Sequence, residues 1–331
     1  MKGLEKILKG IGYGLVIGLA VTSSSCGRIA SLPWKAFGTC FPNPLKLGQH
    51  CSSEKNGQVY TCKAGPVDTA HARIVADRTN KLQKKFDDSV INGKTSISLK
   101  IDQPPKYSIK IDYPNDWDRL SDKRKETVAK EVSIEMGAYF AYVDSVWHEV
   151  WTWHGGRSVF FHSEFASAFS CEDNVSNALG AYVAKVALRS GNKNFNQAVT
   201  KALDMELERL VVLPCDVAEK LANNAKGKRN FDTGLYNGII KPWYIEGISE
   251  CGGKKVEDYF VPNLKKLGQY GFLVDWNMRP GSRAGKKAVK RLEGENKRIG
   301  LPELNKIIYR VRESAIKKYG FKIDEHCHIN N

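Results

Sequence analysis

The sequence lacks an apolar run long enough to cross a membrane as a helix. Its uncharged apolar stretch near the start covers only residues 10–21, whereas a membrane-spanning helix needs about 20 residues. No self-similarity is visible at a period of about 20 to 50 residues, which excludes solenoid and propeller folds. What remains is an ordinary globular chain, with 42% hydrophobic and 26% charged residues.

The motifs of several enzyme classes are absent as well. The chain contains no P-loop, no G-x-G-x-x-G and no G-x-S-x-G elbow of the α/β-hydrolases. His148 and Glu149 match the start of the zinc-peptidase motif H-E-x-x-H. That motif needs a second histidine four residues after the first, but Thr152 occupies this position and His154 comes two residues later. The spacing therefore excludes a zinc peptidase of this type.

The first 26 residues are organised like a lipoprotein signal peptide. Lysines precede the apolar run, the small polar residues 22–25 follow it, and Cys26 comes next. A positive start, a short apolar stretch and small residues before the cleavage site are typical of export. Cysteine directly after them predicts a lipid anchor on Cys26. Gly27 after the cysteine favours the outer membrane, with the protein facing the periplasm.

Acidic residues are too few to balance the basic ones. The chain has 51 Lys and Arg against 36 Asp and Glu, a formal charge of +15. Residues 220–331 carry much of the excess, with 23 basic against 12 acidic residues, or +11. Export makes nucleic acid an improbable partner, whereas anionic lipid, lipopolysaccharide or an acidic cell-wall polymer would be attracted by this charge. A solvated basic face that only favours solubility is the alternative.

The eight cysteines predict disulfides, because the expected compartment is oxidising. Cys40, Cys51 and Cys62 are separated by equal spacings of 11 residues, which lack the short gaps of a zinc knuckle. We expect at least two disulfides, one of them among these three residues. Their connectivity does not follow from the sequence.

Hydrophobic periodicity predicts a mainly α (α+β) fold, a multi-helix domain with a small β-hairpin and a cysteine-containing irregular N-terminal segment. Two alternating runs around Pro104 and Pro105 give the hairpin signal. The expected strands are 96–101 and 107–111, and the expected helices are 67–90, 121–153, 172–188, 195–213, 216–225 and 302–319.

Four segments are expected along the chain. They are the signal peptide 1–25, a Cys/Pro/Gly-rich segment 26–66, a helical core 67–215 that contains the candidate site, and a basic portion 216–331 packed on the same domain.

The ionisable groups of the helix 121–153 are unexpected in an otherwise apolar and aromatic element. They include Glu135, Asp144, His148 and Glu149. A buried isolated charge costs several kcal/mol, so each group must be paired, metal-bound or neutralised. His71 lies on the preceding helix.

We expect these groups to form one polar site across three helices. The candidate catalytic residues are His148, Glu149 and Glu172, and the candidate metal ligands are His71 and His148, with a divalent metal as the cofactor considered. The supporting residues would be Glu135, Asp144, Asp173 and Asn177.

Two functions remain open at this point. One is a hydrolase that acts on an envelope substrate through the His/Glu cluster. The other is a non-catalytic envelope scaffold or binding lipoprotein, in which the cluster is a buried network that holds the helices in register. Convergence of the groups on an open pocket would favour the enzyme, and a sealed, fully paired network would favour the scaffold.

Three blocks carry a resemblance to a known family. They are AHAR at 70–73, WHEVWTW at 147–153 and SAFSCED at 167–173. The chain resembles, over about residues 65–275, an uncharacterised family of Gram-negative bacterial lipoproteins that bear a domain of unknown function. The resemblance implies an envelope protein and implies no activity, cofactor or catalytic residue.

Overall fold

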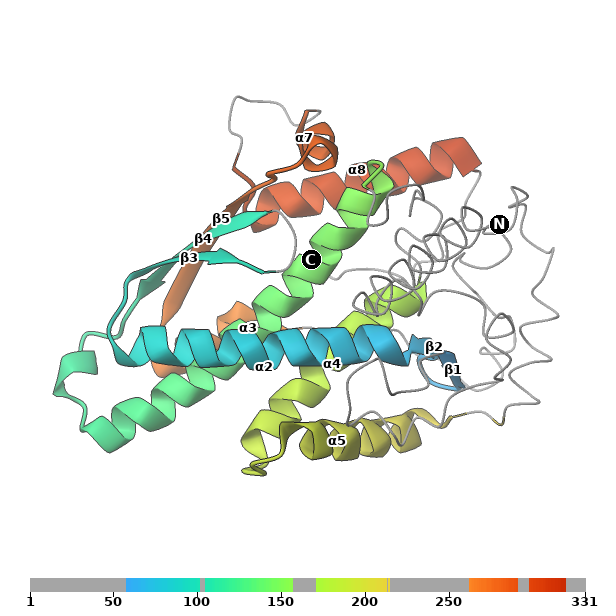
Figure 1. Ribbon diagram of the computed structural model, residues 1–331. Coiled ribbons are helices and arrows are strands. Elements are labelled where there is room, and N and C mark those ends of the chain that lie inside the picture. Colours follow the sequence, from blue (N-terminus) through green and yellow to red (C-terminus); the bar gives the residue numbers. More distant parts are fainter. Residues whose placement is uncertain are drawn as a thin grey trace, which may run out of the picture.

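The computed structural model describes residues 58–101, 105–156, 171–212, 214, 262–290 and 298–319. The expected signal peptide, most of the cysteine-containing segment and the expected helix 216–225 lie outside these residues. The described part is mostly helical with a small antiparallel sheet, which confirms the predicted fold class (Figure 1).

Four helices form the body of the molecule. Helix α2 crosses α3, α4 packs against both of them, and α5 packs on α4 (Figure 1). Helix α3 ends two residues before Gly155, whose backbone is left-handed, with a φ of +84°, and cannot continue a right-handed helix. The bounds are α2 Thr69–Ile91, α3 Asp122–Trp153, α4 Cys171–Arg189 and α5 Phe195–Leu210.

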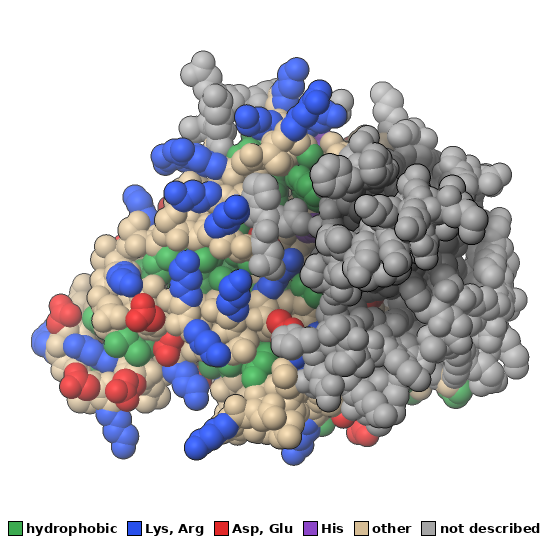
Figure 2. All heavy atoms as spheres, viewed as in Figure 1, with side chains coloured by type: hydrophobic (Ala, Val, Ile, Leu, Met, Phe, Trp, Pro, Cys, Tyr) green, Lys and Arg blue, Asp and Glu red, His purple; other side chains and the backbone are tan. Residues whose placement is uncertain are grey.

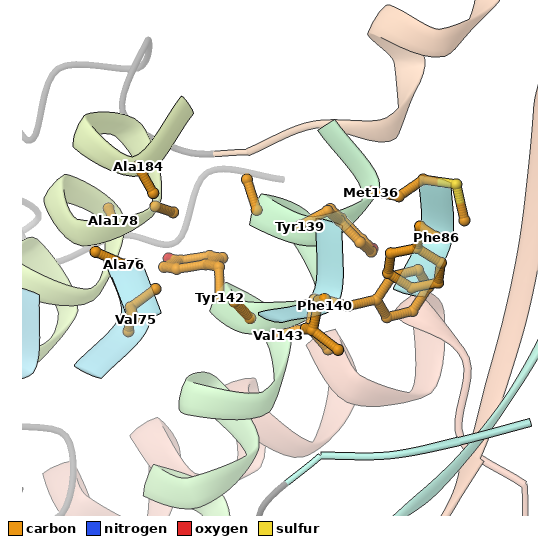
Figure 3. Close-up of a cluster of buried hydrophobic side chains, with 14 of the residues drawn as sticks. Val75, Ala76, Phe86, Met136, Tyr139, Phe140, Tyr142, Val143, Ala178 and Ala184 are labelled. Atoms are coloured by element: carbon orange, nitrogen blue, oxygen red, sulfur yellow. The ribbon is translucent and has the colours of Figure 1, made fainter. Parts of the chain in front are cut away.

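The core lies where these helices meet. Figure 3 shows Tyr142 of α3 pointing towards Ala76 of α2 and Ala178 of α4, whereas Phe140 points towards Phe86. The rings of Phe86 and Phe140 have centroids 5.5 Å apart. Successive residues of α3 thus fill different parts of the core, as expected for a helix that is apolar on all sides.

A three-stranded antiparallel sheet covers another side of α3. Its order is β3-β4-β5, so the third strand comes from the far end of the chain. Side chains alternate between buried and exposed along β3 and β4, which is the pattern of a sheet with one face on the core. Tyr107 of β4 and Trp276 of β5 pack against Phe140. The bounds are β3 Ser96–Lys100, β4 Lys106–Asp112 and β5 Leu273–Arg279.

Smaller elements complete the fold. A second hairpin, β1–β2, precedes α2, and a 3-10 helix, η4, precedes α3. The 3-10 helix η7 and helices α7 and α8 flank β5. Within the described ranges, no helix has the length and apolar character needed to cross a membrane. The bounds are β1 Gln58–Thr61, β2 Gly65–Asp68, η4 Trp117–Arg119, η7 Leu264–Tyr270, α7 Arg283–Val289 and α8 Leu301–Tyr319.

The structure corrects the sequence prediction in three places. Hairpin β1–β2 lies partly in the segment that we expected to be irregular, and strand β5 and helix α7 were not predicted. Strand β5 was missed because it exposes Asp275 and partly exposes Asn277, so that its only fully buried side chains are Trp276 and Met278.

The approach of α4 to α2 depends on Gly180. A Cβ atom placed on Gly180 would lie 2.2 Å from the carbonyl oxygen of Ala72, and 2.9 Å from two other backbone atoms of that residue. A neighbouring backbone cannot rotate away as a long side chain can. The two helices are therefore in contact through their backbones at this point.

We predict that Gly180→Ala lowers the free energy of unfolding by about 1–3 kcal/mol, because the new methyl group forces the helices apart. Intrinsic helix propensity alone would predict the opposite sign, since alanine is better than glycine in a helix by up to about 1 kcal/mol. Urea unfolding measures the difference. Gly268→Ala is the control, because a Cβ atom there meets no heavy atom within 4 Å. Equal stability of Gly180→Ala and the parent would contradict the close contact.

Candidate functional site

Glu135 belongs to an ion cluster between α3 and α4. Its side chain is almost fully buried, and its Oε2 lies 3.2 Å from Nζ of Lys185 while its Oε1 accepts a 2.8 Å hydrogen bond from Nη2 of Arg189. Arg189 also donates through Nε to Glu131, at 2.9 Å. We call these four residues the α3–α4 ion cluster. The two acids are one turn apart on α3, and the two bases are one turn apart on α4.

The ionised form of Glu135 is the stabilised one. Burial raises the pKa of this carboxyl group, but the hydrogen bond from Arg189 and the charges of Lys185 and Arg189 outweigh burial, so the pKa lies below its ordinary value. Burial lowers the pKa of Lys185, against the charge of Glu135. Glu135 is thus an ionised carboxylate paired with two cations, which is not the form of a general acid.

Asp144 belongs to a different network. Tyr107 of β4 donates its hydroxyl hydrogen to Oδ1 of Asp144 over 3.1 Å, and Nη1 of Arg78 on α2 lies 3.7 Å from Oδ2. Arg78 also reaches Oγ of Ser145, at 3.4 Å. Burial, followed by the charge of Asp144, raises the pKa of Tyr107 well above its ordinary value. Tyr107 therefore keeps its proton and acts as the donor.

Helix geometry separates these acids. At about 100° and 1.5 Å per residue, Glu135 and Asp144 project from opposite sides of α3 and are about 13 Å apart along its axis. Glu149 projects from the same side as Glu135 but about 21 Å further along the helix. Glu135 and Asp144, which were expected to support one site, therefore lie in separate contacts.

His148 and Glu149 lie in the last turns of α3. Glu149 is buried, with 3% of its surface exposed, and His148 is half-buried with its ring 5.7 Å from that of Trp151. Because they are consecutive, the two side chains diverge by about 100° around the axis. Thr152 donates to the carbonyl oxygen of His148, so its hydroxyl is used within the helix.

His71 lies in the first turn of α2, where α2 and α4 are joined. The backbone N–H of His71 donates to Oδ1 of Asp68 at 3.1 Å, and the N–H of Asp68 donates to Oγ of Ser176 at 2.7 Å. Asn177 follows Ser176 and is also buried. Glu172 and Asp173 belong to the first turn of α4, but their side chains lie outside the described part of the structure.

The described side chains bring together no cluster of metal-ligating residues. Among the described side chains, no group of three or more His, Cys, Asp or Glu could hold a metal ion. The expectation that His71 and His148 are ligands thus stays a prediction. The disulfides stay a prediction as well, because Cys62 is the one cysteine whose side chain is described, and Cys26 lies outside the described residues.

Sequence reasoning missed the cations that neutralise the buried acids. Lys185 and Arg189 on α4, four residues apart, mirror Glu131 and Glu135 on α3, and this matched spacing was a usable signal. Arg73 was missed too. Its buried guanidinium group donates to Asp77 at 3.0 Å, and to Asn196 of α5.

The comparison with known families agrees with the expected resemblance. Residues 37–230 match the family described as "Protein of unknown function (DUF4056)". This match covers more than half of the chain. The chain belongs to the DUF4056 family. The matched region begins and ends earlier than the expected 65–275, and it contains α2 to α5 with the networks of Glu135 and Asp144. No curated protein and no solved structure matches the chain.

We predict that Glu135→Gln lowers the free energy of unfolding of this DUF4056 protein by about 3 kcal/mol, because it leaves buried Lys185 without its counter-charge. Urea unfolding at neutral pH measures the loss. Glu126→Gln, at an exposed position of the same helix, is the control and should change stability by less than about 0.5 kcal/mol.

The pH dependence gives a second measurement of the same variant. A carboxyl group whose pKa is lowered by folding contributes stability above its ordinary pKa of 4.5 and loses this contribution as the pH falls through the lowered value. The difference between the parent and Glu135→Gln should therefore shrink below pH 4.5. A difference that stays constant into acid would contradict the ion cluster.

Proposed function

We propose that this DUF4056 protein is a non-catalytic scaffold or binding lipoprotein of the cell envelope. The observation that carries this proposal is the separation of two buried acids of α3, Glu135 and Asp144, into different networks, each with its own partners. Glu135 is held by two cations of α4, and Asp144 by a tyrosine of β4 and an arginine of α2. Acids that are occupied in this way join structural elements and are not available to a substrate.

Each network connects α3 to a different neighbour. The α3–α4 ion cluster joins it to α4, and Asp144 joins it to β4 and α2. A further bond, from Nε2 of Gln83 on α2 to Oγ of Ser133, is 3.0 Å long. Hydrogen bonds and ion pairs have preferred directions, whereas apolar packing is less selective, so buried polar contacts favour one register of the helices. A rigid body of this kind suits a protein that presents a surface.

A hydrolase is the second candidate, and one observation favours it. His148 is half-buried and Glu149, the next residue, is buried. An imidazole that solvent can reach therefore lies beside a buried carboxylate in the sequence. In this alternative His148 and Glu149 would act with Glu172 on an envelope substrate.

The variants His148→Gln and Glu149→Gln separate the two functions. For the scaffold, we expect Glu149→Gln to lower the melting temperature by several degrees, since Glu149 is buried and disturbing a buried charged group costs about 3 kcal/mol. His148→Gln should have a smaller effect because its side chain is less buried. We also expect elemental analysis of the parent to find no bound metal.

The opposite pattern would exclude the scaffold. Active-site groups are often retained at some expense of stability. A melting temperature that is unchanged or raised in both variants, together with a metal that the parent binds and the variants lose, would favour the hydrolase in its place.

The proposed location rests on the signal-peptide pattern. The charged start, the apolar run 10–21 and the small residues before Cys26 support export and lipid attachment. Gly27 supports the outer membrane, and the protein would then face the periplasm. The partners proposed with this location are the membrane itself and the anionic molecules of the envelope.

We predict that Cys26→Ala moves the protein from the membrane fraction to the soluble periplasmic fraction. The reason is that buried acyl chains contribute about 0.8 kcal/mol per CH₂ group to membrane binding. Fractionation after a high-salt wash, with detection by antibody, measures the change, and Ser25→Ala serves as a neighbouring control that keeps the cysteine. If the Cys26→Ala protein remained in the washed membranes, the lipid anchor would be wrong.

A further inference from the structure

The outer face of the sheet carries a row of positive charges. Lys100 of β3 lies directly opposite Lys106 of β4, and Lys106 lies directly opposite Arg279 of β5. All three side chains are exposed, whereas the opposite face of these strands packs on the core. We call these three residues the cationic row.

The cationic row is unfavourable for folding. Directly opposed residues of antiparallel strands have Cβ atoms about 5 Å apart, and like charges in such pairs are destabilising. Among the described residues, no acid lies within ion-pair distance of any of the three. The same fold gives Lys185 and Arg189 acidic partners. The cationic row is thus a local exception that packing does not explain.

Helix α7 extends this positive surface. It begins just beyond Arg279, and its apolar side, with Ala284 and Ala288, is buried. Val289 is partly buried, the other side chains of α7 are exposed and basic, and residues 283–290 include no acid. Figure 2 shows Lys and Arg side chains over the strands and α7, whereas acidic side chains gather at the lower left, near the start of α3. The exposed basic residues of this helix and its end are Arg283, Lys286, Lys287 and Lys290.

We propose that the cationic row, together with α7, is a docking surface for the phosphate groups of an anionic lipid bilayer. This proposal rests on the proposed lipid anchor, which would hold the chain beside such a surface. The next row of the sheet, Ser98, Ser108 and Asn277, supplies neutral hydrogen-bond donors beside the charges.

The shape of the surface favours a bilayer over a single small anion. Three strands spaced by about 4.8 Å spread the cationic row over about 10 Å, and α7 lengthens it. Charges distributed over an open sheet face match the distributed charges of lipid headgroups. A protein already anchored by lipid needs only modest attraction from each cation to fix its orientation on the membrane.

The test uses the full chain with Cys26→Ala, so that no acyl chain contributes to binding. We expect this protein to bind vesicles of phosphatidylglycerol and phosphatidylcholine, to bind vesicles of phosphatidylcholine alone much more weakly, and to be released by salt. Adding Lys100→Gln, Lys106→Gln and Arg279→Gln should lower partitioning into the anionic vesicles roughly a hundredfold. Neutralising Lys286, Lys287 and Lys290 in the same way should also lower it.

A matched control separates the surface from net charge. Arg124→Gln, Lys193→Gln and Lys201→Gln remove the same charges, two lysines and one arginine, at exposed positions outside the sheet and α7. This control should keep its binding within about threefold. Equal losses in the two triple variants would overturn the proposal. All six positions are exposed, and thermal unfolding would verify that the variants are folded.

Soluble polyphosphate distinguishes a polymer from a bilayer. Suppose that the variant with all three residues of the cationic row changed to Gln lost its binding to polyphosphate but kept its binding to anionic vesicles. The occupant would then be an anionic polymer and the proposal would be wrong. Failure of the lipid anchor is seen separately, by fractionation of the Cys26→Ala protein with the cationic row also neutralised. Retention of that protein in washed membranes would reject the anchor without affecting the vesicle result.

Discussion

Complete burial of the middle of α3 is the constraint on which the rest of the structure depends. From residue 132 to residue 147 every side chain of this helix is buried, whichever way it points. A polar group in such a segment cannot use water, so it usually finds a partner on another element or in its own backbone, and the buried indole N–H of Trp147 is an exception. Ser133 is bonded to Gln83, Glu135 to two cations, and Tyr139 accepts a hydrogen bond from the indole N–H of Trp276. Each partner comes from a different neighbour, and together they determine what can pack around α3.

Glu135 and Asp144 show that two buried acids on the same helix need not belong to the same site. Glu135 meets cations, and its pKa falls although burial opposes the fall. Asp144 meets a neutral hydroxyl and a more distant arginine. Burial, followed by the charge of Asp144, raises the pKa of Tyr107. The two side chains project from nearly opposite sides of α3, so Glu135 meets α4 and Asp144 meets the sheet. The carboxylates of Glu135 and Asp144 thus join α3 to different neighbours.

The sequence predicted the helices well because their signals are local. The pattern of α3 is long and uninterrupted, and the ends of α2, α4 and α8 lay within two residues of the predictions. It also showed that Glu135 and Asp144 needed partners. It could not show which ones, because periodicity gives the faces of one helix relative to each other and not the neighbour that each face meets. Strand β5 was missed for a related reason: its partner β4 is far away in the chain, and its own alternation is weak. Lys185 and Arg189 repeat the spacing of Glu131 and Glu135, but the sequence does not show that α4 lies beside α3.

The inner constraint also determines the outer surface of the sheet. Side chains alternate along β4, so Tyr107 and Ile109 face the core while Lys106 and Ser108 face outward. A slip of one residue would move Lys106 into the core and would take Tyr107 away from Asp144. The buried face of β4, together with the hydrogen bond from Tyr107 to Asp144, therefore fixes the register of this strand. The pairing of β4 with β3 and β5 then aligns the three residues of the cationic row. Strand β4 thus contacts the buried network of α3 with one face and carries the cationic row on the other. Weakening the network should therefore weaken the alignment of the cationic row.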